Sequence, residues 1–172
     1  MRTIKKVASH IFIDGFGGMT QGLFATLIIG TMIQQIGLLI GGSTGNVIYL
    51  LGKAAAALTS AGIGVGVAVK YGESPLVTVS AAVAAMVGGY AGKITGGTFF
   101  VDGNAVLAGP GEPLGAFIAA FAGITCGHLV SGKTKVDIIV TPVITIGAGS
   151  VVGLLVGPPI SQTVSYTHLT LP

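Results

Sequence analysis

Residues 16–40 read FGGMTQGLFATLIIGTMIQQIGLLI and contain no charged side chain. A hydrocarbon layer about 30 Å thick is crossed by a helix of roughly 20 mostly apolar residues, because each residue advances the helix by about 1.5 Å. This stretch is therefore long enough to cross a bilayer with some tilt. It predicts a membrane-spanning helix near the start of the chain.

The charged residues of the whole chain leave further gaps of the same kind. Only 8% of the residues are charged, whereas ordinary soluble domains carry about 25%. No charge lies between Asp14 and Lys53, between Leu114 and Gly132, or after Asp137. A soluble protein with a very apolar core is the alternative, but it needs a polar surface that this composition does not supply. The sequence therefore predicts an all-α integral membrane protein.

The expected architecture is a polytopic helical bundle with about five transmembrane helices. A turn is expected at 42–46, and the spans after the first are expected at 47–69, 75–90, 114–130 and 138–156. The second span contains Gly62, Gly64 and Gly66 and is expected to be broken or partly unwound. The stretch from Gly96 to Pro113 cannot be continuous helix, because glycine and proline recur in it. We expect a loop or a re-entrant segment there.

Glycines recur at spacing four in three places, which lets helix backbones approach closely in lipid. These glycines are Gly37, Gly41 and Gly45, then Gly88, Gly92 and Gly96, and finally Gly149, Gly153 and Gly157. We expect them to pack helices rather than to bind ligands.

The basic residues indicate the orientation in the membrane, because lysine and arginine favour cytoplasmic loops. Lys53 lies within the second expected span. Of the other seven basic residues, six fall on one side in a five-span arrangement and Lys93 alone falls on the other. The six are Arg2, Lys5, Lys6, Lys70, Lys133 and Lys135. This distribution predicts a cytoplasmic amino terminus.

Several functional classes find no support in the sequence. The net charge is +3, but the basic residues are dispersed and lack an aromatic platform, so no nucleic-acid partner is expected. Cys126 is the single cysteine, and no residue cluster suggests a metal or another cofactor. No residue pair resembles an activated nucleophile and its base. Chemistry on a substrate would therefore reside in a partner.

Residues Gly127 to Thr134, GHLVSGKT, formally match a phosphate-binding P-loop. A true P-loop follows a strand and opens a helix, so that backbone N–H groups face the phosphates. Here an uncharged helical span comes first, which argues against nucleotide binding. An ATP-driven pump subunit, in which Lys133 would engage phosphate, remains as a distant alternative.

The most informative polar motif is Gly111-Glu112-Pro113. A carboxylate beside an apolar span is costly unless it faces water, a partner or a ligand. Glycine and proline also leave backbone groups outside a helix, which is tolerated at membrane depth where the chain lines a cavity. The hydroxyls of a sugar suit such an acceptor, although a glutamate in a solvated interfacial loop is an equal alternative.

Two further residues are candidates for hydrogen bonds to a substrate. His128 lies near the end of the fourth span and could donate to a hydroxyl, or it could simply be solvated there. Asn104 lies in the loop before Gly111, and polar residues of this kind also join helices. Neither residue is specific by itself.

Four segments together resemble the PfoR-type branch of the EIIC sugar permeases of the phosphotransferase system (PTS). They are FIDGFGGM at 12–19, AGIGVGVA at 61–68, GPGEPLGAF at 109–117 and KTKVD at 133–137. The similarity runs from about Met1 to Ser161.

This resemblance implies a multi-pass protein of the bacterial inner membrane that binds a sugar and moves it inward. A partner EIIB domain would then phosphorylate the sugar, and EIIC relatives suggest a homodimer in the lipid when full length. Glu112 becomes the leading substrate-binding residue, with Gly111 and Pro113, because a similar Glu-Pro element holds sugar hydroxyls in other EIIC permeases. The better-known permeases carry a β-branched residue and threonine where this chain has Pro110 and Gly111, which leaves the sugar open. Since members of this branch also act as regulators, a membrane sensor that binds a ligand without transport is the alternative.

Family members are considerably longer than this chain. We therefore expect residues 1–161 to be the amino-terminal part of an EIIC-like domain. Residues 162–172 are expected to be a non-native tail, since TVSYTHLTLP at 163–172 resembles a translated sequencing adapter from a transposon end. A genuine short tail outside the membrane is the alternative.

Overall fold

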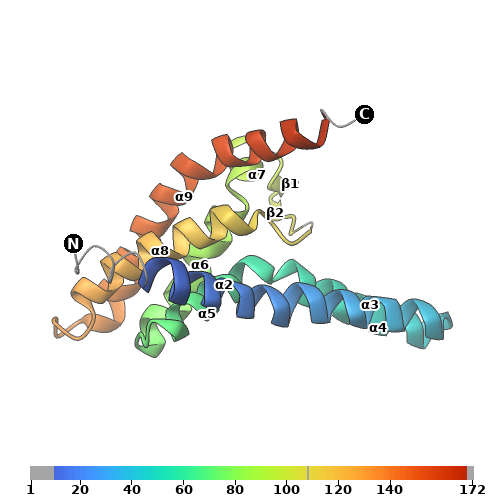
Figure 1. The fold of residues 1–172 in the computed structure, drawn as a ribbon, viewed down its shortest axis with the longest axis horizontal. Coiled ribbons are helices and arrows are strands. Elements are labelled where there is room, and N and C mark those ends of the chain that lie inside the picture. The colour runs from blue at the N-terminus through green and yellow to red at the C-terminus, as the bar shows by residue number, and fades with distance from the viewer. Residues whose placement is uncertain (1–9, 108, 170–172) are drawn as a thin grey trace.

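The computed structural model describes residues 10–107 and 109–169, and helices dominate these ranges (Figure 1). The chain first forms one continuous helical run of four segments, η1 (His10–Gly15), α2 (Phe16–Leu23), η2 (Phe24–Ile28) and α3 (Ile29–Ile40). The two η segments have π-helical hydrogen bonding. Ile13–Ile40 covers 28 residues and is apolar enough to cross a membrane. The first predicted span is confirmed.

The second span is broken, as predicted, but at a different residue. Helices α4 (Gly42–Ala57) and α5 (Thr59–Lys70) are bent by 53° at Leu58. The glycines expected to unwind the span are helical instead and pack against other helices. A Cβ on Gly62 would lie 3.1 Å from the Gly22 carbonyl oxygen of α2, and a Cβ on Gly64 would lie 2.5 Å from the Ala81 carbonyl oxygen. Their lack of a side chain serves close approach rather than bending.

The turn before α4 is also shorter than predicted. Gly41 has φ +66° and Gly42 has φ +64°, a conformation that residues with a side chain rarely adopt. These two glycines reverse the chain, so Ser43 to Asn46 already belong to α4. The prediction of a turn over 42–46 was wrong.

The rest of the chain forms two helices, a small β-hairpin and then two long helices. The elements are α6 (Pro75–Gly89), α7 (Ala91–Thr95), β1 (Phe100–Val101), β2 (Asn104–Ala105), α8 (Pro113–Val130) and α9 (Asp137–Leu169). Ser74 caps α6, since its Oγ accepts a hydrogen bond from the Val77 N–H, and Pro75 occupies the first turn as predicted. The expected non-helical region before α8 is a loop that carries the antiparallel β1–β2 hairpin.

The last helix does not end at Gly157, where glycine and two prolines predicted its end. The backbone of α9 stays helical through Pro158 and Pro159 to Leu169. Prolines are tolerated in membrane helices because neighbouring groups can satisfy the backbone positions that they disturb. The prediction that the helix ends at Gly157-Pro158-Pro159 was therefore wrong.

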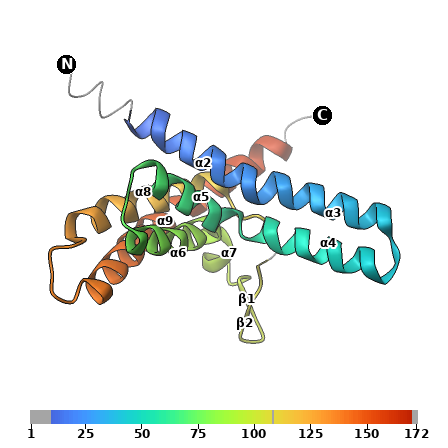
Figure 2. The ribbon, with the colours of Figure 1, turned by 90° about the horizontal axis from the view of Figure 1, so that it is seen from below.

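The core lies where α5, α6 and α8 meet, with α2 and α9 packed beside them (Figure 2). Its fully buried side chains are small or β-branched, such as Val67, Ala81 and Ala120. Glycines permit this density as expected: a Cβ on Gly149 would lie 2.6 Å from the Ala119 carbonyl oxygen. Helix packing is therefore the role of most of the regularly spaced glycines.

The all-α membrane class is confirmed. In the described part of the chain, three helices are long and apolar enough to cross a membrane, or four if the bent α4–α5 pair forms one span. The sequence predicted about five, but α6 has 15 residues and reaches only about 22 Å. Large apolar side chains are exposed along the arm formed by α3 and α4, including Met32, Ile36, Leu39, Val47 and Leu51.

Candidate functional site

The loop that precedes α8 has a backbone shape that only glycine provides. Gly109 has φ +81° and Gly111 has φ +75°. A Cβ on Gly111 would also lie 2.5 Å from the Ser60 Oγ and 3.0 Å from the Gly89 carbonyl oxygen. Both conformation and space therefore require glycine at residue 111.

Three hydrogen bonds fasten this loop to two helices of the core. The Ser60 hydroxyl of α5 donates to the Pro110 carbonyl over 3.0 Å. The Tyr90 hydroxyl, at the end of α6, donates to the Gly109 carbonyl. The Glu112 backbone N–H donates to the Gly89 carbonyl over 2.7 Å. Residues 109–112 are thus fixed from both sides.

Glu112 occupies the N-cap position of α8, and Pro113 occupies the first helical position. The Glu112 carbonyl accepts the first helical hydrogen bond, from the Ala116 N–H over 3.0 Å. Its side chain makes no capping bond, and it is half-buried. Among the residues that the structure describes, its carboxylate has no hydrogen bond or ion pair. A fixed backbone therefore carries a half-buried carboxylate that the described residues leave unpaired.

Asn104 is exposed on strand β2 of the hairpin before this loop. Its Nδ2 donates to the Asp102 carbonyl over 3.3 Å, within the same hairpin. The structure gives no contact between Asn104 and Glu112. The two candidates share one end of α8 but are not brought together.

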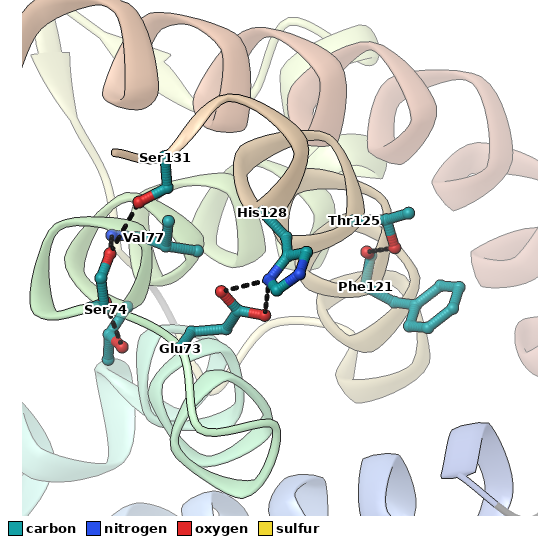
Figure 3. Close-up of polar contacts among 8 residues, drawn as sticks. Glu73, Ser74, Val77, Phe121, Thr125, His128 and Ser131 are labelled. Carbon is teal, nitrogen blue, oxygen red and sulfur yellow. Dashed lines mark hydrogen bonds and ion pairs between the residues drawn. The ribbon is translucent and has the colours of Figure 1, made fainter. Parts of the chain in front are cut away.

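His128 lies at the other end of α8 (Figure 3). Its Nδ1 lies 2.9 Å from one carboxylate oxygen of Glu73 and 3.2 Å from the other. The His128 side chain is 71% exposed and that of Glu73 only 8%. Sixteen residues separate His128 from Glu112, which corresponds to about 24 Å along the helix. The two residues therefore cannot hold the same small sugar at once.

The turns beside His128 bring two distant parts of the chain together. The hydroxyl oxygens of Ser74 and Ser131 lie 3.2 Å apart, one from each turn (Figure 3). Burial, and then the negative charge of Asp14, raise the pKa of Tyr71 in the first of these turns. The basic residues Lys70, Lys133 and Lys135 are exposed at this end. We refer to this end, formed by residues 70–75 and 131–137, as the lysine end.

The P-loop-like segment belongs to the lysine end. Gly127 to Val130 form the last turn of α8, and the residues after them form a turn before α9. A helix carboxyl end presents carbonyl oxygens rather than N–H donors. This is the opposite of the geometry that phosphates require.

Two groups of contacts had no signal in the sequence. Ser60 and Tyr90 are buried and contact the Glu112 loop from helices far away in the chain. Glu73 pairs with His128 across 55 residues. Each contact depends on which helices become neighbours. In the described residues, no three of His, Cys, Asp and Glu gather as a metal site would require.

A family model described as "Phosphotransferase system, EIIC" matches residues 13–167. The chain belongs to this EIIC family. As an EIIC domain it is a membrane subunit of sugar transport, with a sugar as its substrate class and an EIIB domain as its partner. Together with its apolar helices, this indicates a multi-pass protein of the inner membrane.

No curated protein and no solved structure matches this EIIC chain. The matched residues include every candidate described above. The PfoR-type branch and the domain boundary at Ser161 stay predictions.

Proposed function

We propose that this EIIC chain binds a sugar at the Glu112 loop and translocates it inward, where EIIB phosphorylates it. The observation that carries this proposal is the half-buried Glu112 carboxylate, which has no partner among the described residues while its backbone is fastened. An ionised carboxylate only accepts hydrogen bonds, and it has two oxygens that can receive neighbouring hydroxyls of a sugar ring. Such charge-assisted hydrogen bonds are stronger than neutral ones.

The neighbours of Glu112 support the same role. Gly111 gives the loop its shape, and Pro113 begins α8 without an N–H group. The amino-terminal end of a helix also favours a negative charge. Asn104, on the hairpin at this end, is proposed as a second hydrogen-bonding residue for the sugar.

His128 is proposed to act at a different point of the path. Because it lies at the lysine end, it would meet the sugar hydroxyls where the sugar leaves towards EIIB. The exposed apolar side chains of the α3–α4 arm are proposed to face lipid or a second copy of the chain. The quoted motifs further support the PfoR-type branch.

The function is tested by thermal unfolding of the purified chain with a panel of hexoses, disaccharides and sugar alcohols. We expect a higher unfolding temperature with at least one sugar, because a ligand that binds only the folded state stabilises it. Vesicles that also contain EIIB and a phosphoryl donor should then take up that sugar. Stabilisation without uptake would favour a ligand sensor, and no stabilisation by any sugar would contradict the proposal.

The lysine end is proposed to face the cytoplasm, together with the amino terminus. The contacts of Glu73 with His128 and of Ser74 with Ser131 support this, because they bring the two lysine-bearing turns to one side. Lys93 follows α6 and therefore lies towards the opposite end. This arrangement agrees with the bias of basic residues towards the cytoplasm.

Single cysteines provide the test of orientation, since Cys126 is the only native one. In a Cys126→Ala background, a cysteine in place of the exposed Ala105 of β2, Ala105→Cys, should react with a membrane-impermeant maleimide in intact cells. Lys133→Cys should react only after permeabilisation. The reverse pattern would place the lysine end outside.

A further inference from the structure

Tyr90 is a buried aromatic residue whose hydroxyl contacts two parts of the fold that lie far apart in the chain. Its side chain is 1% exposed at the end of α6. Its hydroxyl lies 3.2 Å from the Ala57 carbonyl oxygen and closer still to the Gly109 carbonyl oxygen. One acceptor belongs to the break between α4 and α5, and the other to the Glu112 loop.

The break explains why a hydroxyl is needed here. A helix end leaves its last carbonyl groups without helical donors, and burying them unpaired is costly. The Thr59 hydroxyl, itself buried, donates to the Ala56 carbonyl over 2.6 Å. The Tyr90 hydroxyl is placed against the next carbonyl, that of Ala57. Two hydroxyls, those of Thr59 and Tyr90, therefore lie within hydrogen-bond distance of the last carbonyl groups of α4.

A phenol carries one proton, so Tyr90 cannot make two full hydrogen bonds as a donor. The shorter contact, to Gly109, identifies the main acceptor, and Ala57 shares the same proton. The loop and the break are thus tied to one atom. Their relative position is set by that atom.

The Tyr90 ring is itself held in place. The ring of Phe99 lies 5.5 Å from it between centroids, and the Lys93 Nζ lies 5.3 Å from its centroid. Aromatic pairs and a cation over a ring each contribute a modest attraction. Because the ring is held, the position of the Tyr90 hydroxyl is held as well.

We infer that Tyr90 is a positioning residue for sugar binding, which sets the place of Glu112 by fastening Gly109. This inference rests on the proposed role of Glu112. Gly109 lies three residues before Glu112, and the Ser60 hydroxyl also tethers the chain between them, at Pro110. Without the Tyr90 hydroxyl, the loop would keep its charge and its hydrogen bonds to Ser60 and Gly89, but it would lose its tether at Gly109. Sugar affinity would fall although Tyr90 never touches the sugar.

Tyr90→Phe tests the inference, because it removes only the hydroxyl. We expect the dissociation constant of the stabilising sugar to rise about tenfold, the scale of one unsatisfied buried carbonyl. The maximal uptake rate should change less than the affinity. Ser60→Ala removes the second side-chain tether of the loop and should lower the sugar affinity as well. If Tyr90→Phe does not fold, an unchanged sugar affinity in Ser60→Ala would contradict the idea that tethering of this loop sets the affinity.

Ser80→Ala is the matched control. Ser80 lies on the same helix and is buried, but its hydroxyl donates to Leu76 within α6, over 2.7 Å. Its removal should leave sugar affinity unchanged at a similar cost in stability. A loss of affinity equal to that of Tyr90→Phe would indicate a general structural effect and overturn the inference.

A double substitution separates this inference from the function on which it rests. If Tyr90 acts through Glu112, adding Tyr90→Phe to Glu112→Gln should weaken binding little further. Fully additive losses would overturn the positioning role. Unchanged affinity in Tyr90→Phe, with reduced affinity in Glu112→Gln, would reject this inference alone. Unchanged affinity in Glu112→Gln would reject the proposed function as well.

Discussion

Glu112→Gln is expected to weaken sugar binding about 10- to 100-fold, since hydrogen bonds to a charged group contribute about 1.5–3 kcal/mol. The amide has nearly the same shape, but it loses the charge and replaces one acceptor with a donor. Because the Glu112 carboxylate has no partner among the described residues, its loss should leave the fold intact. The measurement is the sugar concentration dependence of the unfolding temperature, compared with the parent chain.

Asp102→Asn is the control for a general effect of charge. Asp102 is an exposed carboxylate on the neighbouring hairpin, and its φ of +51° suits asparagine well. Sugar affinity should not change in this variant. Equal affinities for Glu112→Gln and the parent chain would remove Glu112 from the site.

The second large effect is expected at Gly22, where even alanine should destabilise the fold by about 3 kcal/mol, the upper end of the usual range for overpacking. A Cβ on Gly22 would overlap the carbonyl group of Gly62 on α5. The obstacle is backbone, so no side-chain rotation can relieve it, and α2 would have to move away from α5. The unfolding temperature of the purified chain measures the loss.

Gly17→Ala offers a matched control on the same helix. Among the described residues, a Cβ there would meet only the flexible Lys70 side chain, at 3.8 Å. Alanine has the higher helix propensity, by up to about 1 kcal/mol. Gly17→Ala should therefore be neutral or slightly stabilising. Similar melting of the Gly17 and Gly22 variants would show that α2 and α5 do not pack in this way.

The long apolar elements could be predicted from the sequence because their signal depends only on the solvent around them. The charge-free stretch at 16–40 and the span ending at Val130 both follow from the cost of charge in lipid. The turn at Pro75 follows from a local rule for helix starts. The glycines at 62–66 were misread, because the same missing side chain permits either bending or close packing. Only the neighbouring helix decides between these.

The candidate site could be predicted only in part. The Gly-Glu-Pro motif correctly indicated a helix start after a non-helical segment, and so placed Glu112 at an end of α8. The distance between His128 and Glu112 also follows from the sequence, because the two residues lie at opposite ends of one predicted helix. Tyr90 and Ser60 gave no such signal, because their contacts with the loop arise from packing between distant helices.

The irregular backbone of the first two spans lies at one shared height. The π-helical segment Phe24–Ile28 includes Thr26, whose methyl group would lie 2.6 Å from a Cβ on Gly62, just beyond the break at Leu58. Regular helices resist bending through their aligned hydrogen bonds, and interruptions are where bends concentrate. Both interruptions therefore lie at one level, and beyond it α3 and α4 leave the core side by side as one arm. The Ala57 carbonyl lies at this level, so the Tyr90 hydroxyl joins the base of the arm to the Glu112 loop.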